Sequence, residues 1–509
     1  MARAGGAGRA DEPRHDQPQP ALDRGTERPQ CADRRHRFCR RSDARYRADD
    51  LRDRAGQSPR PPAASRYGQL RNAPSGLCRG VRPVGAEPVS SSVWHPFTQH
   101  GLGEPIPRVV RGEGAAVFTD DGRRIIDGIS SWWVTTHGHC HPRIMAAIAD
   151  QAQKLDQVIF AGFTHEPAET VAAGLREIMP APLEHVFFSD SGSTSVEVAL
   201  KMALGYWANR GEPRHRILVM ESSYHGDTVG GMSVGARGVF SASYAPLLFD
   251  VGTIPFPAGG AEQATLDALE AACSAQEKPA AFIVEPLILG AGGMRMYGPD
   301  MLWEMAEICA VHDVLFIADE VMTGWGRTGT LLACEQANVI PDLLCLSKGL
   351  TGGSMPLAVT MATAPIFDAH YSTDKARMFF HSSSYTANPL ACAAAAANLA
   401  IWRDEPVRER IASLCERQEA WRVRLASDSR FHNVRRTGTI VAAEVAVPDG
   451  DYLSAAGPRM AAVFREANVL LRPLGNTVYL MPPYCIDDDD LAALHHAVDR
   501  AADAALAGG

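Results

Sequence analysis

Short runs of consecutive apolar residues recur between about residues 185 and 350, and helical patterns separate them. The clearest runs lie in the segments HVFFSDSGS, RILVMESSYHG, AAFIVEP, VLFIADEV and LLCLSKG. Several apolar residues in a row are typical of a strand that is covered on both faces. Strands of this kind that alternate with helices predict an α/β fold with a mostly parallel sheet.

Each of these runs meets a polar residue at the point where the strand should end. The five residues are Asp190, Glu221, Glu285, Asp319 and Lys348. Ligands of open α/β sheets bind beyond the carboxyl ends of the strands. We therefore expect a binding site at this edge of the sheet, with the polar side chains facing it.

The chain after about residue 401 has a different pattern. An amphipathic helix over 408–427 precedes expected strands over 438–447 and 476–484, and a last helix covers 490–506. This order predicts a smaller α+β domain. We expect four parts: an extension over 1–90, an N-terminal part of the small domain over 91–140, a large domain over 141–400 and the rest of the small domain over 401–509.

The composition is that of a globular chain. Of its 509 residues 46% are hydrophobic, enough for a large core. No uninterrupted apolar stretch reaches the length of a membrane span, and the Ala-rich segment 388–402 is expected to be a closely packed buried helix. The eleven cysteines have no regular spacing, which favours reduced thiols in a cytoplasm over disulfides.

The net charge of −9 is the sum of a positively charged N-terminal segment and a negatively charged remainder. Residues 1–90 hold 19 Arg, no Lys and 11 acidic residues (+8), whereas the other 419 residues hold 31 basic and 48 acidic residues (−17). The first segment is poor in large apolar side chains, so we expect it to be disordered. A nucleic-acid-binding tail and an organelle-targeting tail are alternatives that the interspersed acids weaken. A start codon assigned too far upstream is a third, since no second Met precedes Met145.

The segment SDSGSTSVEVALKMALGYW predicts a strand end, a tight turn and the start of a helix. Thr194 and Glu197 have the spacing of a capping box. Free backbone N–H groups and the positive end of the helix dipole make such a turn an anion site. Gly192 would permit close approach and Ser193 would add a hydroxyl. An ordinary helix cap is the simpler alternative.

Asp319 and Lys348 add two further chemical groups at the same edge. A desolvated lysine amine is a nucleophile that forms a Schiff base with an aldehyde. A carboxylate at the edge of a dry core can hold a proton on a partner nitrogen. With the anion site, these groups describe a pocket for pyridoxal 5'-phosphate. A solvated loop lysine is the alternative for Lys348 taken alone.

Three other patterns resemble known sites but favour simpler interpretations. GWGRTG (324–329) matches a dinucleotide fingerprint, yet no helix is expected to open at its end. HGHCHP (137–142) resembles a metal cluster, but its tight spacing suits a turn before Pro142. The acidic run 487–490 precedes the last helix, where it should cap the positive dipole end. We expect no metal site.

The motifs together resemble the class III (fold type I) aminotransferases over nearly all of residues 91–505. The general motifs are SDSGSTSVEVALKMA, SYHGDT, IADEVMTGWGRTG and LSKGLTGG. A second set resembles the branch of the family that serves biotin biosynthesis: WHPFTQH, DGISSWWVTTHGH, GAGGMRMY and RPLGNTVYLMPPY. The resemblance implies a homodimer with active sites at the interface, in the cytoplasm and without nucleic acid or membrane partners.

Matching motif positions imply a set of site residues. By resemblance Lys348 is the Schiff-base lysine, Asp319 the partner of the pyridinium nitrogen and Tyr224 the ring that stacks on the cofactor, supported by Asp227. The phosphate ligands implied are Gly192, Ser193, and Ser383 and Ser384 of the neighbouring subunit. The substrate contacts implied are Phe97, Trp132, Trp133, Tyr224, Lys348, Ser382, Arg472 and Tyr479.

The reaction implied is ping-pong transamination from S-adenosylmethionine to 8-amino-7-oxononanoate. Lys348 would move a proton as general base and acid, and Arg472 would clamp a substrate carboxylate. Phe97 stands where many relatives carry Tyr, so the donor pocket lacks one hydroxyl. The alternatives are another class III aminotransferase of ω-amino acids or diamines, a DNA-binding regulator with an aminotransferase-like domain, and an inactive homologue.

Overall fold

The computed structural model describes residues 91–238, 240–448, 450 and 454–507. The extension over 1–90, for which the sequence predicted disorder, lies outside the described residues. The chain divides into two units, Met1–Trp94 and His95–Gly509, and the second unit has the architecture given below. Among the described helices, none is long and apolar enough to cross a membrane.

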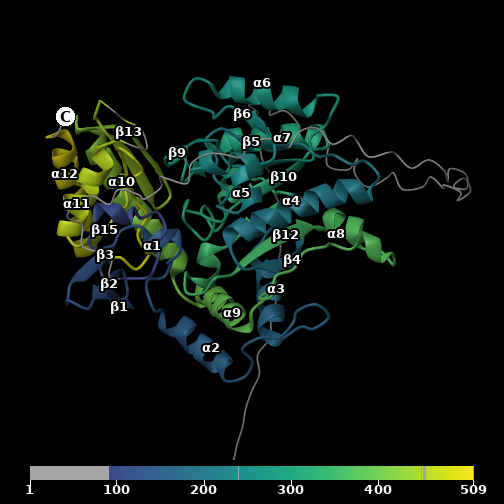
Figure 1. The fold of residues 1–509 in the computed structure, drawn as a ribbon, viewed down its shortest axis with the longest axis horizontal. Helices are drawn as coiled ribbons and strands as arrows, with labels where there is room; N and C mark the ends of the chain where they lie inside the picture. The colour runs from purple at the N-terminus through teal and green to yellow at the C-terminus, as the bar shows by residue number, and fades with distance from the viewer. Residues whose placement is uncertain (1–90, 239, 449, 451–453, 508–509) are drawn as a thin grey trace, which may run out of the picture. The chain divides into compact units, whose positions relative to one another are not determined.

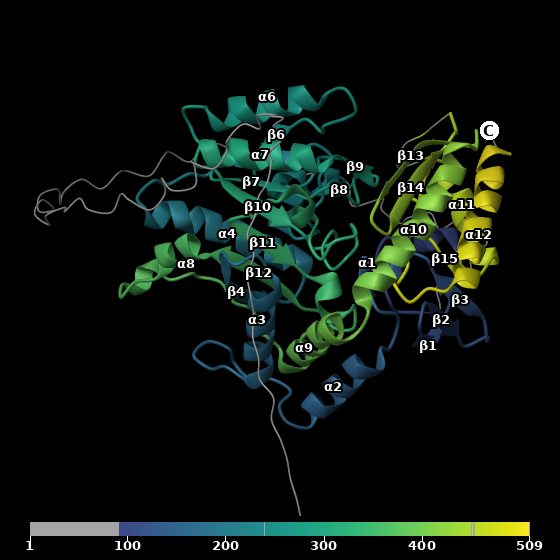
Figure 2. The same ribbon diagram turned by 180° about the vertical axis from the view of Figure 1, so that it is seen from behind.

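A seven-stranded sheet forms the centre of the second unit (Figures 1 and 2). β12 is antiparallel to β11 and β4, and the other neighbouring pairs are parallel. The mostly parallel α/β sheet predicted from the sequence is therefore confirmed, and each of the five apolar runs forms a strand. The strand order is β4 (Leu183–Ser189), β12 (Ala358–Thr363), β11 (Leu343–Leu346), β10 (Leu315–Asp319), β7 (Ala281–Val284), β5 (Ile217–Met220) and β6 (Gly252–Ile254).

Both faces of this sheet are covered, which explains why its strands are apolar throughout. Ile317 of β10 lies in a core shared with α4 (Gly192–Asn209), and the preceding Phe316 lies in the opposite core with residues of α7 (Pro299–Val311). A strand between two dry cores has no polar face, so alternation is absent from its sequence. Further helices around the sheet are α3 (Glu166–Ile178), α6 (Glu262–Cys273) and α8 (Ala364–His370).

A four-stranded sheet, a three-stranded sheet and three helices form a second region of the unit. One sheet has the order β1 (Val109–Glu113), β2 (Ala116–Thr119), β3 (Arg124–Asp127) and β15 (Val469–Leu470). The other has the order β13 (Phe431–Thr437), β14 (Ile440–Val445) and β16 (Thr477–Leu480). The helices are α10 (Val407–Ala426), α11 (Ala456–Glu466) and α12 (Asp488–Leu506).

β15 pairs in parallel with β3, so segments from the two ends of the unit share one sheet. This pairing supports the proposal that 91–140 and 401–509 form one small domain around the large domain over 141–400. α2 (Pro142–Ala152) and α9 (Pro389–Asp404) pack against each other. α9 is the buried Ala-rich helix that the sequence predicted. The short elements are η1 (His100–Leu102), α1 (Ser130–Trp133), α5 (Val229–Ser233), η2 (Ala242–Leu247), β8 (Ile288–Leu289), β9 (Arg295–Met296), η3 (Ala333–Ala337), η4 (Lys348–Thr351) and η5 (Lys375–Arg377).

The predicted capping box on α4 was wrong by three residues. The cap is Ser191, whose hydroxyl accepts from the amide of Thr194, while the Thr194 hydroxyl accepts from the amide of Ser191. Glu197 instead accepts a hydrogen bond from the amide of Gly230 (2.8 Å). Serine and threonine have the same capping chemistry, so the spacing pattern alone fits either start of the helix.

The simpler interpretations of the three other patterns agree with the structure. Turn and bend residues make up and follow GWGRTG, and the next element is the short 3-10 helix η3, which begins at Ala333. α2 begins at Pro142, directly after the histidine-rich turn. Asp487 caps α12, accepting from the amide of Asp490 (2.8 Å).

Candidate active site

Three of the five polar groups at the strand ends lie close enough to influence one another's charge. Glu285 follows β7, Asp319 ends β10, and Lys348 comes two residues after β11. Burial lowers the pKa of Lys348 to about 8, and the carboxylates of Asp319 and Glu285 oppose this effect. An amine with this pKa is partly neutral near physiological pH, as a nucleophile or general base must be.

The two remaining strand-end residues have other surroundings. Glu221 is exposed, and its carboxylate accepts from the amide of Phe256 (3.5 Å). Asp190 accepts from the hydroxyl of Thr194 (3.2 Å), near the start of α4. The expectation that all five groups face one site was therefore wrong for Glu221. The loop after a strand sets the direction of such a side chain, and the apolar run carries no information about it.

Lys348 lies where two backbone segments pass close to each other. Its φ is 46°, in a region that is uncommon for residues other than glycine. Its Nζ lies 4.7 Å from the centre of the Trp133 ring. A Cβ atom on Gly349 would lie 2.7 Å from the Cβ of Trp325. The glycine lets the loop pass against Trp325.

Asp319 forms a buried pair with His225. Nδ1 of His225 lies 2.6 Å from Oδ2 of Asp319, and Oδ1 accepts from the amide of Val321 (3.1 Å). Nε2 of His225 is buried and has no hydrogen-bond partner among the described residues. His225 was not predicted as a site residue, although it lies between Tyr224 and Asp227 in the SYHGDT motif.

Glu285 ties the loop that carries Tyr224 to the sheet. Its two carboxylate oxygens accept from the amides of Tyr224 (2.9 Å) and Gly290 (3.0 Å). Burial raises the pKa of Glu285 to about 7, and the nearby Asp319 charge adds to this rise. Burial and the Asp227 carboxylate also raise the pKa of the Tyr224 hydroxyl. Glu285 was predicted only as a strand end, and its support of the Tyr224 loop depends on tertiary contacts.

The start of α4 reaches the same place from another strand. A Cβ atom on Gly192 would lie 2.6 Å from Val321, whose amide binds Asp319. The hydroxyl of Ser193 accepts from the amide of Asp227 (3.1 Å). Because the first amide groups of a helix have no acceptor within the helix, this end is suited to an anion. The structure thus brings the turn at 192–193, Asp319 and the Tyr224 loop together.

The three predicted serines lie on a different segment, 381–388. The hydroxyl of Ser382 donates to the carbonyl of Ser383 (3.2 Å), and Ser383 Oγ lies 3.5 Å from the hydroxyl of Thr386. The carbonyl of Ser384 accepts from Nε2 of Gln157 (2.6 Å). Within the described part of the chain, none of these hydrogen bonds involves Lys348 or Asp319. The predicted role of the serines requires a second subunit and stays a prediction.

Four of the predicted aromatic substrate residues form two contacting pairs, and Arg472 lies beside one of them. Nε1 of Trp133 donates to the hydroxyl of Tyr479 (3.0 Å). The rings of Trp132 and Phe97 lie 5.5 Å apart, and both are partly exposed. The guanidinium of Arg472 lies 5.1 Å from the centre of the Trp132 ring, and its Nη2 donates to the carbonyl of Phe97 (3.3 Å).

Arg327 is a buried cation that was not predicted as a site residue. Its side chain donates to the carbonyls of Trp133 (3.3 Å), Thr135 (3.4 Å) and Pro482 (3.1 Å). Its charge also lowers the pKa of Lys348. The glycine-rich segment around it was the available signal, but a sequence pattern does not reveal which arginine becomes buried.

These groups fit pyridoxal 5'-phosphate. The amine of Lys348 suits an aldehyde, the buried Asp319 carboxylate suits a ring nitrogen, and the turn at Gly192 and Ser193 suits a phosphate. Tyr224 lies on the loop that contacts both Ser193 and Glu285. The arrangement can hold an aldehyde cofactor and move protons beside it.

Comparison with known proteins agrees with this chemistry. Residues 99–502 match the family model described as "Aminotransferase class-III". A Synechococcus elongatus protein named adenosylmethionine-8-amino-7-oxononanoate aminotransferase is 47% identical, over 81% of this chain and 98% of its own length. A Mycobacterium leprae protein of the same name is 37% identical, over 83% of this chain and 98% of its own length.

Two solved structures resemble the fold closely. The adenosylmethionine-8-amino-7-oxononanoate aminotransferase of Methanocaldococcus jannaschii has a TM-score of 0.77 and 33% identity, over 81% of this chain and 97% of that one. An amine transaminase from an uncultivated Pseudomonas species, in its PLP-bound form, has a TM-score of 0.76 and 32% identity, over 81% of this chain and 98% of that one.

Proposed function

The chain belongs to the class III aminotransferases, and we propose that it transfers an amino group from S-adenosylmethionine to 8-amino-7-oxononanoate. The product would be 7,8-diaminononanoate, an intermediate of biotin biosynthesis. It is a fold type I enzyme that uses pyridoxal phosphate. The choice of substrates rests on one observation. A relative named for this reaction is 47% identical to the chain, across 98% of the relative's own length.

The cofactor supplies an aldehyde that bonds to amines and a ring that accepts electrons from the neighbouring carbon. Lys348 would take a proton from the carbon that bears the donor's amino group and return it to the C4′ carbon of the cofactor. Its lowered pKa, about 8, leaves a fraction of the amine free to accept that proton. Asp319, fixed by His225 and the Val321 amide, would hold a proton on the ring nitrogen.

The remaining predicted residues would bind and orient the reactants. Gly192 and Ser193 would hold the phosphate, and Tyr224, with Asp227 nearby, would stack on the ring. Trp132 and Trp133 would line the aliphatic chain of the substrates. Arg472 would bind a substrate carboxylate, because a guanidinium fork matches two carboxylate oxygens. Phe97, Ser382 and Tyr479 would complete the substrate pocket.

We also propose that two copies of the chain form a dimer in which Ser383 and Ser384 reach the partner's phosphate. Segments 156–157 and 384–388 are joined by hydrogen bonds from Gln157 to Ser384 and from Asn388 to Asp156. Large apolar side chains on or beside these segments are exposed, which favours a covered surface. They are Ile159, Phe163, Met378, Phe380 and Tyr385, each at least half exposed.

Light scattering after size exclusion would test the dimer. The expected mass is twice the 54.8 kDa of the chain. Phe380→Arg, which puts a charge in the patch, should shift the protein toward the monomer. A monomer of unaltered wild-type chain would contradict the proposal. The location we propose is the cytoplasm, which the eight free thiols of the described residues support.

A half-reaction assay would test the substrate. The visible absorbance of the purified holoenzyme should change on adding S-adenosylmethionine, because the bound cofactor takes up its amino group. Ornithine, γ-aminobutyrate and lysine should leave the spectrum unchanged at the same concentration. A response to one of these amines and none to S-adenosylmethionine would favour the alternative, an aminotransferase of ω-amino acids or diamines.

A further inference from the structure

A buried asparagine holds the loop that carries Lys348 from behind. Asn398 interrupts the run of small apolar residues on α9, and its side chain is completely buried. Its Nδ2 donates to the backbone carbonyls of Gly349 and Leu350, both at 3.0 Å. These are the two residues that directly follow Lys348. A polar side chain buried in such a helix costs free energy unless hydrogen bonds offset its desolvation, and Asn398 makes two of them to this loop.

The same asparagine is bound by His137. Oδ1 of Asn398 lies 2.8 Å from Nε2 of His137, whose side chain is 6% exposed. The two N–H groups of Asn398 are used by carbonyls, so its Oδ1 must be the acceptor in this bond. His137 therefore carries its proton on Nε2. The chain of donors runs from His137 through Asn398 to the Lys348 loop.

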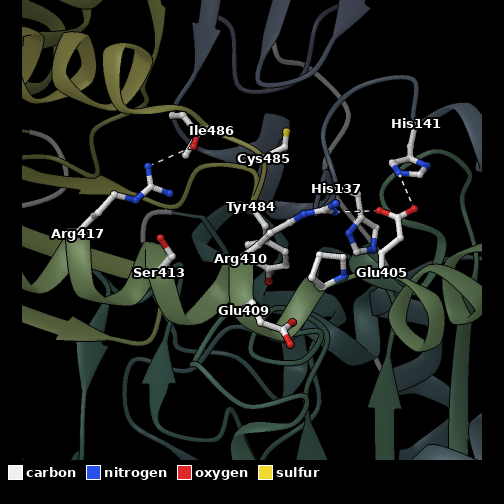
Figure 3. A pocket seen from close by; sticks show the side chains of 11 residues that line it. His137, His141, Glu405, Glu409, Arg410, Ser413, Arg417, Tyr484, Cys485 and Ile486 are labelled. Atoms are coloured by element: carbon white, nitrogen blue, oxygen red, sulfur yellow. Dashed lines mark hydrogen bonds and ion pairs between the residues drawn. The ribbon is translucent and has the colours of Figure 1, made fainter.

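His137 also lines a cavity of about 620 Å³ (Figure 3). Its walls include His141, Glu405, Arg410, Arg417 and Tyr484. Nδ1 of His137 is buried and has no partner among the described residues. Burial lowers the pKa of His137 to about 4, so the ring is neutral at physiological pH. Nε2 of His137 therefore remains the donor in the hydrogen bond to Asn398 over the physiological pH range.

The loop itself has little room to move toward this pair. A Cβ atom on Gly349 would lie 3.0 Å from the methyl group of Thr136, one residue before His137. His137 and its neighbour thus contact the loop both through Asn398 and directly. These contacts fix the backbone that follows Lys348, whose Nζ lies beside the Trp133 ring.

We propose that His137 and Asn398 are a positioning pair, which fixes the backbone after Lys348 and keeps water away from its side-chain nitrogen. The proposal rests on the function proposed above for Lys348. If the pair loosens, water should reach that nitrogen and favour its protonated form. The pair touches no reacting atom, so its effect passes through the carbonyls of Gly349 and Leu350.

Three substitutions separate positioning from plain stability. Asn398→Asp keeps the shape and the acceptor for His137 but removes both donors to the loop. His137→Asn has an amide too short to reach Asn398, whereas His137→Gln can place its N–H near the position of Nε2. Cys392→Ala is the matched control, because Cys392 is buried on the same helix and has no hydrogen bond to the loop.

The measurement is the midpoint of the pH titration of the holoenzyme's visible absorbance. Asn398→Asp and His137→Asn should raise this midpoint by about one unit as the nitrogen gains water. Their kcat should fall about tenfold, with KM values within about twofold of the wild type, because binding groups are untouched. His137→Gln should restore the wild-type midpoint. Cys392→Ala should lower the melting temperature and leave the midpoint in place.

Unchanged midpoints in Asn398→Asp and His137→Asn, or an equal shift in Cys392→Ala, would overturn the positioning role. If Asn398→Asp does not fold, the two His137 variants decide alone, since equal behaviour of Gln and Asn would also overturn it. A wild-type protein without cofactor absorbance would refute the proposed function instead. The two failures are therefore distinguishable in one set of spectra.

Discussion

Gly226→Ala should weaken cofactor binding, because Gly226 lies where the loop after β5 crosses the start of α4. The φ of Gly226 is 110°, a conformation that side chains with a Cβ rarely adopt. A Cβ atom at this position would overlap the hydroxyl of Ser193. Ser193 would have to move, and its hydrogen bond from the Asp227 amide (3.1 Å) would be lost.

The size of the effect follows from these two contacts. Backbone strain at such a φ costs about 1–3 kcal/mol. Loss of the hydrogen bond to Ser193 costs about 0.5–1.5 kcal/mol more. If most of the relaxation displaces Ser193 from the anion site, cofactor affinity should fall roughly 10- to 1,000-fold, since a tenfold change corresponds to about 1.4 kcal/mol.

The assay is a titration of the apoprotein with pyridoxal phosphate, followed by absorbance, together with its thermal unfolding. Gly238→Ala is the matched control on the same segment. A Cβ atom there would meet no atom within 4 Å, and its φ is outside the positive region. This control should keep both wild-type affinity and wild-type melting temperature.

Wild-type affinity in Gly226→Ala would refute the role of the turn at 192–193 as the phosphate site. A loss of thermal stability without a loss of affinity would show that the strain does not displace Ser193 from the anion site. An equal loss of affinity in Gly238→Ala would show that the segment tolerates no substitution, and the argument from the Ser193 contact would fail.

Three further predictions test the chemical groups. Lys348→Ala should abolish transamination and the visible absorbance of the bound cofactor, and retained turnover would contradict the assignment. Arg472→Lys should raise the KM for the keto acceptor about tenfold and that for the donor less, because a lysine loses the bidentate fork; equal changes would mean that the clamp is misassigned. Because burial lowers the pKa of Lys348 to about 8, kcat should rise with pH through about 8, as the amine loses its proton. The unfolding free energy of the apoprotein should rise over the same range and up to the ordinary lysine pKa, since the unfolded chain still holds that proton. Profiles that stay flat from pH 6 to 9 would contradict both.

The large sheet was predictable because its signal is local. Strands such as β10 and β11 are covered on both faces, so four or more apolar residues in a row are unavoidable. The rule that ligands bind at the carboxyl ends then pointed to Asp319 and Lys348. It failed for Glu221, since nothing in an apolar run records which way the next loop turns.

The supporting residues could not be predicted, because their function depends on contacts distant in sequence. His225 lies 94 positions from Asp319, and His137 lies 261 positions from Asn398. In the sequence, His225 and His137 are histidines in loops, and Asn398 is an asparagine in an alanine run. Such residues are usually solvated or satisfied locally, so their burial becomes informative only once the partners are placed.

Trp133 shows why the site lies where the large sheet and the smaller sheets meet. Its ring faces Nζ of Lys348, at the end of a strand of the large sheet. Its indole donates to Tyr479 of β16, in a small sheet, and its carbonyl is bound by Arg327. A side chain held by both regions can shape a pocket only while they stay docked. Any motion that separates them would therefore expose Lys348 to water, raise its pKa and remove the free amine on which proton transfer depends.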